Sequence, residues 1–207
     1  MKRYFKYKSL SGDSFKYFVK MLIESKMYAA CFKELNDPME GAYLSDKESK
    51  DYLQSQKEEM KIISLVEKKA DELPCNMLMW SHYSNEHRGC CVEFHFKNKA
   101  DEYDVCKVNY IKEIKQGEIN SVESVLCRKF EDWKYEQEVR YIGLKELVPI
   151  EIDKIYLGMR IDDLYDNNDT SNETFYRELI NRLCPHVKVD KMRAEDFDGH
   201  HTETLKE

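Results

Sequence analysis

Residues 78–96, LMWSHYSNEHRGCCVEFHF, carry the pattern on which the fold class depends. The last seven residues of this stretch alternate between two faces, as a β-strand requires. One face holds Val92, Phe94 and Phe96, and the other holds Cys91, Glu93 and His95. CCVEFHF is therefore predicted to be a half-buried strand, preceded by a loop or helical turn at LMWSHY that leads to Gly89.

Similar patterns on both sides of this strand predict a mixture of strands and helices. Strands are expected at residues 3–9, 27–32, 105–111 and 136–144, with others at VPIEI, KIYLGMR and HVKVDKM. Helices are expected at residues 13–26, 46–72, 117–132 and 173–183. We expect a single α+β domain over residues 1–192, with a mainly antiparallel or mixed sheet, split or continuous, flanked by helices. Residues 193–207 are too polar to pack and form a tail.

The composition excludes several classes of protein. A net charge of -7 over 207 residues argues against nonspecific nucleic-acid binding, because phosphate neutralisation needs clustered Lys and Arg. Nothing approaches the roughly 20 apolar residues of a membrane-spanning helix, so no membrane partner and a cytoplasmic location are expected. The seven cysteines are odd in number and mostly scattered, which favours buried thiols in a reducing compartment.

Residues 82–95 are rich in metal-binding side chains, but their spacing does not fit a zinc site. His82 and His87 are five residues apart, whereas the usual helical pair is four apart. We expect no metal, and the adjacent Cys90 and Cys91 are interpreted as packing. The chain also lacks the glycine-rich loops that cradle a dinucleotide or nucleotide.

The segment WKYEQEVRY, residues 133–141, is a second candidate site. On a strand, Glu136, Glu138 and Arg140 project from one face, which is either solvated or the wall of a polar cleft. Trp133 and Tyr135 just upstream favour the cleft, because these rings are costly to leave in water and can stack on a flat ligand.

Five strings together resemble a bacterial family catalogued as domain of unknown function 2971. They are KYKSL at 6–10, LNDPME at 35–40, LMWSHYSNEHRGCCVEF at 78–94, WKYEQEVR at 133–140 and IYLGMR at 155–160. The resemblance covers roughly residues 4–160. It implies no activity, because the family name supplies none.

The layout is also similar to that of ADP-ribosyltransferases, in which a split antiparallel sheet holds NAD without a glycine-rich loop. The resemblance implies NAD as substrate and Glu138 as the catalytic carboxylate, with Glu136 two residues before it. It assigns nicotinamide stacking to Tyr4, Tyr7, Trp80 and Tyr83 and pyrophosphate binding to Lys8 and Arg140, and Ser81 stands in for the middle Ser/Thr motif. The first strand offers Lys6, Tyr7 and Lys8 where these transferases carry His or Arg. The acceptor of ADP-ribose is unknown.

Two alternatives remain open. One is a metal-dependent or histidine-based hydrolase of a nucleotide or nucleic acid, with His82, His87 and Glu93 as acid, base or ligands. The other is a binding module without catalysis, which would use the aromatic residues and Asn36 and Asp37 of the NDP turn as contacts, and the segment 46–72 as a partner surface.

Overall fold

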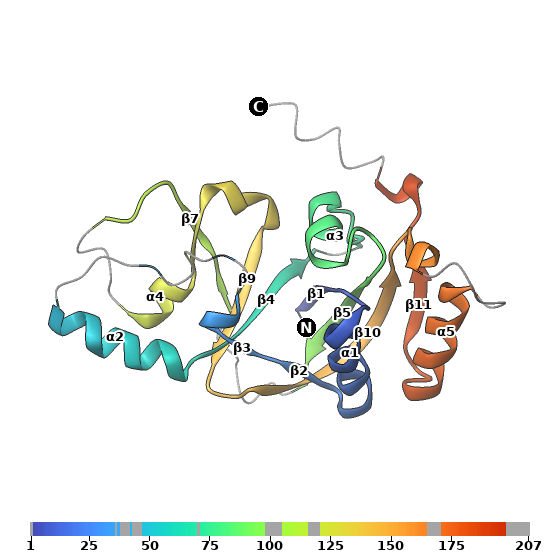
Figure 1. Ribbon diagram of the computed structural model, residues 1–207, viewed down its shortest axis with the longest axis horizontal. Coiled ribbons are helices and arrows are strands. Elements are labelled where there is room, and N and C mark those ends of the chain that lie inside the picture. The colour runs from blue at the N-terminus through green and yellow to red at the C-terminus, as the bar shows by residue number, and fades with distance from the viewer. Residues whose placement is uncertain are drawn as a thin grey trace. The chain divides into compact units, whose positions relative to one another are not determined.

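The computed structural model describes residues 2–35, 37, 42, 47–69, 71–97, 105–115, 121–164 and 171–197. Contacts within the chain divide it into two compact units. Unit 1 comprises Met1–Lys26, Glu67–Lys97 and Pro149–Glu207, and unit 2 comprises Met27–Val66 and Asn98–Val148. Both units combine helices with mainly antiparallel strand pairs, so the predicted α+β class is confirmed (Figure 1).

Unit 1 contains neighbouring strands in the order β11, β10, β5 and β1. Their bounds are Arg3–Lys8 for β1, Cys90–Phe96 for β5, Leu147–Leu157 for β10 and Lys188–Lys191 for β11. The pairs β1–β5 and β5–β10 are antiparallel, and β10–β11 is parallel. The strand predicted at CCVEFHF is therefore confirmed, with a partner on each side. It is not half-buried as predicted, because both of its faces are buried from Cys90 to Phe94.

The helices predicted at residues 13–26 and 173–183 are present in unit 1, and LMWSHY lies in a further short helix. Their bounds are Gly12–Glu24 for α1, Met77–Tyr83 for α3 and Asn172–Leu183 for α5, with 3-10 turns η3 at Ile161–Leu164 and η4 at Ala194–Phe197. Asn76 caps α3 by accepting hydrogen bonds from the N–H groups of Leu78 and Met79. The helices α1 and α5 contact each other through the rings of Phe15 and Tyr176, whose centroids are 6.1 Å apart.

In unit 2, β9 (Glu138–Gly143) lies between β4 (Lys61–Lys68) and β6 (Val105–Lys107), and both pairs are antiparallel. Strand β3 (Ala30–Cys31) also pairs with β4, and β2 (Lys26–Tyr28) precedes it. Strands β7 (Asn109–Ile111) and β8 (Arg128–Phe130) form a separate parallel pair, hereafter the β7–β8 ribbon.

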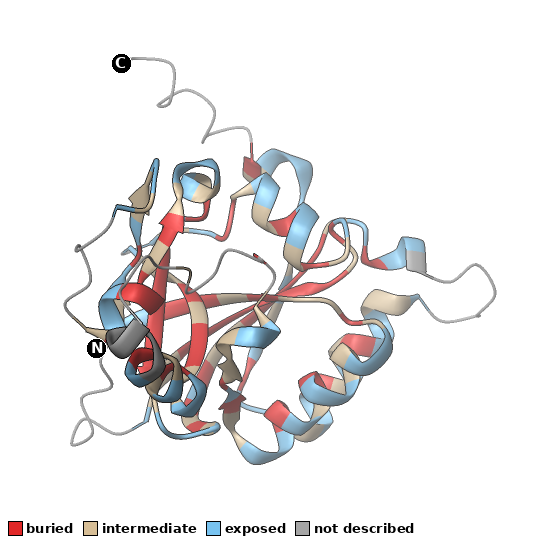
Figure 2. Cartoon of the chain, turned by 60° about the vertical axis from the view of Figure 1, so that its left-hand side comes forward, coloured by how far each residue is buried: buried red, intermediate tan, exposed pale blue. Residues whose placement is uncertain are grey.

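Two predicted helices of unit 2 are wrong over part of their length. Helix α2 (Lys47–Glu59) ends where β4 begins, and α4 (Val122–Leu126) is followed by β8. The 3-10 turns η1 (Phe32–Glu34) and η2 (Glu131–Glu136) complete the unit. The cause in β4 is burial, since Ile62, Ile63 and Leu65 are each at most 2% exposed. Figure 2 shows the buried residues along the strands, while the helices keep exposed faces.

The cysteines divide into one disulfide and five free thiols. Cys106 and Cys127 are bonded, which contradicts the prediction that all seven are thiols. Cys90 and Cys91 are fully buried, and burial raises the pKa of Cys90 to about 12, so their interpretation as packing residues is supported.

The predicted boundary between domain and tail falls within a packed segment. Phe197 in η4 is only 4% exposed, and the Cys75 thiol donates to the carbonyl of Asp196 at 3.0 Å. The single domain over 1–192 stays a prediction. In the described part of the chain, no helix has the length and apolar character needed to cross a bilayer.

Candidate functional site

Four charged side chains of unit 2 form a buried cluster, hereafter the β9 charge network. It consists of Lys129, Glu136, Glu138 and Arg140, whose exposed fractions are 8%, 3%, 5% and 0%. Two carboxylates therefore balance two cations. Burial of four charges is tolerated only because each is paired and hydrogen-bonded.

Arg140 and Glu138 form a two-point ion pair within the network. Arg140 Nε lies 2.8 Å from Glu138 Oε1, and Arg140 Nη2 lies 3.0 Å from Glu138 Oε2. This two-point contact fixes the orientation of the carboxylate. Arg140 Nη1 donates to the carbonyl of Leu126 at 2.5 Å, so the guanidinium is itself anchored to the end of α4.

Lys129 joins the two carboxylates. Its Nζ lies 2.5 Å from Glu136 Oε2 and 3.4 Å from Glu138 Oε2. The same ammonium lies 4.7 Å from the centroid of the Trp133 ring, at the distance of a cation–π contact. Trp133 therefore contacts a lysine of the network in this structure.

The network keeps Glu138 ionised. Burial alone would raise the pKa of this carboxyl, but the charge and hydrogen bonds of Arg140, with help from Lys129 and Ser64, lower it to about 2. Ser64 lies on β4 opposite Arg140 in the strand register. The backbone N–H of Glu138 donates to the Tyr110 hydroxyl at 2.9 Å.

The prediction that Glu136, Glu138 and Arg140 project from one face of a strand is wrong for Glu136, although all three belong to the β9 charge network. Glu136 ends η2, and Gln137 adopts a left-handed conformation with φ of 46° before β9 begins. The face is neither solvated nor open, since its side chains are buried. Sequence reasoning missed Lys129 and Ser64, because both lie in strands that were predicted as helix.

Unit 1 holds a second candidate, the aromatic–histidine cluster of Tyr7, Trp80, Ser81, His87 and Phe197. Tyr7 and Trp80 meet edge to face at 5.4 Å between centroids, and His87 stacks parallel to Trp80 at 6.0 Å. Phe197 lies edge-on to His87 at 5.8 Å. Ser81 Oγ is 3.3 Å from His87 Nε2 and donates to the Met77 carbonyl.

The backbone that carries His87 is strained. Asn85, Glu86 and His87 have φ values of 50°, 53° and 68°, a run of left-handed residues that costs energy for any side chain with a Cβ. The segment packs closely against Gly158, where an added Cβ would lie 2.0 Å from the His87 carbonyl oxygen. Such strain often marks a functional site.

The imidazole of His87 is buried and incompletely satisfied. Burial, followed by the charge of Arg160, lowers its pKa. Its Nδ1 is buried and has no hydrogen-bond partner among the described residues. This cluster therefore offers a neutral histidine beside an exposed serine hydroxyl.

The other predicted ligand contacts are distributed unevenly. Tyr4 faces Phe94 and Phe96, on the opposite side of β1 from Tyr7, because the two tyrosines are an odd number of positions apart on a strand. Tyr4 and Tyr7 therefore cannot line one pocket together. Lys8 is half-buried and burial lowers its pKa. The remaining predicted contacts are His82, which is exposed, Tyr83, which is half-buried, Asp37, which is buried, and Asn36, which lies outside the described residues.

Of the residues named for a hydrolase, Glu93 is held by cations and a hydroxyl group. Glu93 is 2% exposed and contacts Lys68 at 2.7 Å, Tyr156 at 3.0 Å and Arg3 at 3.2 Å. Across the described ranges, no group of three His, Cys, Asp or Glu side chains is placed to hold a metal ion.

Comparison with protein families identifies a match in the middle of the chain. Residues 79–141 match the family model described as protein of unknown function (DUF2971). The match includes WSHY and YEQEVR, so the resemblance seen in the sequence is confirmed over this segment. No curated protein and no solved structure matches the chain.

Proposed function

We propose that the chain cleaves the bond between nicotinamide and ribose in NAD and transfers ADP-ribose to an acceptor or to water. Glu138 is the key carboxylate. The observation that supports this most is a buried Glu138 whose pKa is about 2, so that it is negative at any physiological pH. The match to a family of unknown function neither adds an activity nor opposes one.

Cleavage of the nicotinamide–ribose bond requires a group that stabilises positive charge on the ribose. As the C1′–N bond breaks, its electron pair leaves with nicotinamide, and the ribose carbon gains positive charge. The acceptor oxygen then bonds to C1′ and releases its proton. A carboxylate that is already ionised and oriented stabilises the developing cation without reorganising, and burial strengthens the effect.

The network also suggests how a ribose hydroxyl would reach Glu138. The contact from Lys129 Nζ to Glu138 Oε2, at 3.4 Å, is longer than both contacts from Arg140 to the same carboxylate. Lys129 keeps a shorter contact with Glu136, at 2.5 Å, and can give up Glu138 without becoming an unpaired buried charge. Glu136 thus acts as a positioning residue, and Arg140 holds the other side of the carboxylate.

The test is nicotinamide release from NAD by the purified chain, with and without a metal chelator. Glu138→Asp keeps the charge but withdraws the carboxylate by one methylene, and we expect release to fall by about 100-fold. Glu123→Asp on the exposed face of α4 is the matched control and should leave the rate unchanged. A wild-type chain that releases no nicotinamide, or a folded Glu138→Asp chain with the full rate, would refute the proposal.

A further inference from the structure

A pocket of about 630 Å³ lies on one face of the β7–β8 ribbon in unit 2, hereafter the ribbon pocket. This volume falls in the range of pockets that hold small molecules. Its polar lining comes from Asn109, Lys112, Glu113, Lys115, Ser124 and Arg128. The ribbon's opposite face carries Tyr110 and Lys129, which contact the β9 charge network.

The ribbon pocket is cationic in a chain whose net charge is -7. It presents three cations and one carboxylate. Lys115 Nζ is 3.3 Å from Glu113, and Lys112 Nζ is 3.9 Å from Glu131. All four of these side chains are between 45% and 81% exposed, so the pairs are weak and leave the lysines able to turn toward an anion.

Arg128 gives the ribbon pocket a fixed donor. Its Nη2 donates to the carbonyl of Ala42 at 2.7 Å, which holds the guanidinium at the wall. Its Nε and Nη1 make no hydrogen bond within the described part of the chain, so these N–H groups can donate to phosphate oxygens. Ile111 adds an apolar surface beside these charges.

The cations predicted from sequence to bind phosphate are poorly placed for it. Arg140 is 0% exposed and is held by Glu138 and Leu126, and burial lowers the pKa of Lys8. We propose that the ribbon pocket, with Lys112, Lys115 and Arg128, binds the phosphate groups of a nucleotide-sized ligand. The base or sugar of that ligand packs on Ile111. This inference does not depend on Glu138 or on cleavage of NAD.

Isothermal titration of the purified chain with pyrophosphate, ADP and adenosine tests the inference at low salt. We expect pyrophosphate and ADP to bind and ADP to bind at least tenfold more tightly than adenosine, because the charged hydrogen bonds go to phosphate. The double variant Lys112→Gln/Lys115→Gln should weaken ADP binding by about tenfold. Both lysines are exposed, so the variant should fold, as circular dichroism will check.

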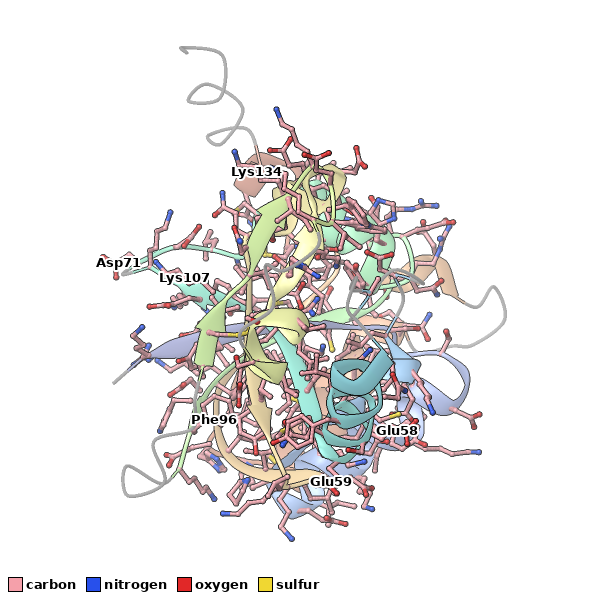
Figure 3. All side chains as sticks on the ribbon, turned by 90° about the vertical axis from the view of Figure 1, so that its left-hand side faces the viewer. Glu58, Glu59, Asp71, Phe96, Lys107 and Lys134 are labelled. Atoms are coloured by element: carbon pink, nitrogen blue, oxygen red, sulfur yellow. A yellow bond between two sulfur atoms is a disulfide. The ribbon has the colours of Figure 1, made fainter. Side chains whose placement is uncertain are left out.

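The control is Lys107→Gln/Lys134→Gln, which removes the same charge from exposed positions of the same unit outside the ribbon pocket (Figure 3). It should bind ADP as the wild type does. Equal binding of ADP and adenosine, equal loss in both double variants, or binding of a single-stranded oligonucleotide with no binding of ADP would overturn the inference. A chain that binds ADP here but releases no nicotinamide would refute only the proposed function.

Discussion

Replacing Glu138 by Gln should lower the free energy of unfolding by about 3–5 kcal/mol at pH 7, because it leaves buried charges without their partner. The Arg140 guanidinium is 0% exposed and makes two contacts with this carboxylate, at 2.8 and 3.0 Å. A neutral amide cannot compensate that charge. The side-chain volume hardly changes, so the lost free energy of unfolding measures the electrostatic interaction of the carboxylate with its cations.

The pH dependence gives a second measure of the same interaction. The pKa of Glu138 falls from an ordinary 4.5 to about 2 in the folded chain. Between these values the unfolded chain binds more protons, so stability rises with pH across this window and is lost as pH falls through it. Each pH unit corresponds to about 1.4 kcal/mol, which gives about 3 kcal/mol in total.

Urea unfolding followed by circular dichroism at pH 7 and pH 3 separates these contributions. The difference in free energy of unfolding between wild type and Glu138→Gln should be about 2 kcal/mol smaller at pH 3 than at pH 7. At pH 3 the wild type has already lost most of the stabilisation that comes from the lowered pKa of Glu138. Glu123→Gln, an exposed control, should match the wild type at both pH values. A difference in free energy of unfolding below about 1 kcal/mol at pH 7 would refute the conclusion that Glu138 compensates the buried charge of Arg140. A difference that does not change with pH would refute it as well.

Two further predictions concern stability. Cys106→Ser should lower the free energy of unfolding of the oxidised chain by about 3 kcal/mol, as expected for a crosslink over a sequence separation of 21, while Cys31→Ser changes little. Added dithiothreitol should destabilise the wild type but not Cys106→Ser, and equal sensitivity of the two chains would contradict this. Glu86→Gly should raise the free energy of unfolding by about 0.5–1 kcal/mol, because Gly adopts the observed φ of 53° without strain. Glu178→Gly, at an exposed position within α5, is the control and should lower the free energy of unfolding by about 1 kcal/mol. If thermal denaturation shows that both variants are destabilised, residue 86 is not strained.

The sequence predicted correctly those segments in which the spacing of apolar residues fits either a strand or a helix, but not both. CCVEFHF alternates strictly and forms β5, and the apolar spacing after Asp13 forms α1. The segment KIISLVEK sits among Lys and Glu residues, and its apolar residues at 62, 63, 65 and 66 fit a helix stripe as well as a buried strand. Pairing with β3 and β9 decides between them, and such long-range pairing is not visible in a local pattern.

The candidate site was predicted in part for the same reason. Glu136, Glu138 and Arg140 stand close in the sequence, so their grouping follows from local spacing. Their partners come from elsewhere, since Ser64 arrives on β4 and Lys129 on β8. Because the sequence did not predict Ser64 and Lys129 as partners, it could not decide whether the carboxylates of Glu136 and Glu138 face solvent. A buried lysine is needed to balance Glu136, and nothing in RKF marks Lys129 as that residue.

The two faces of the β7–β8 ribbon share one backbone. Asn109 and Arg128 line the ribbon pocket, while Tyr110 and Lys129, the next residue in each strand, contact the charge network. Any coupling between an anion in the ribbon pocket and the ionic state of the carboxylates in the network must therefore act equally in both directions. If phosphate binding displaces the ribbon, it must also change the proton affinity of Glu138, and protonation of Glu138 must change phosphate affinity by the same factor.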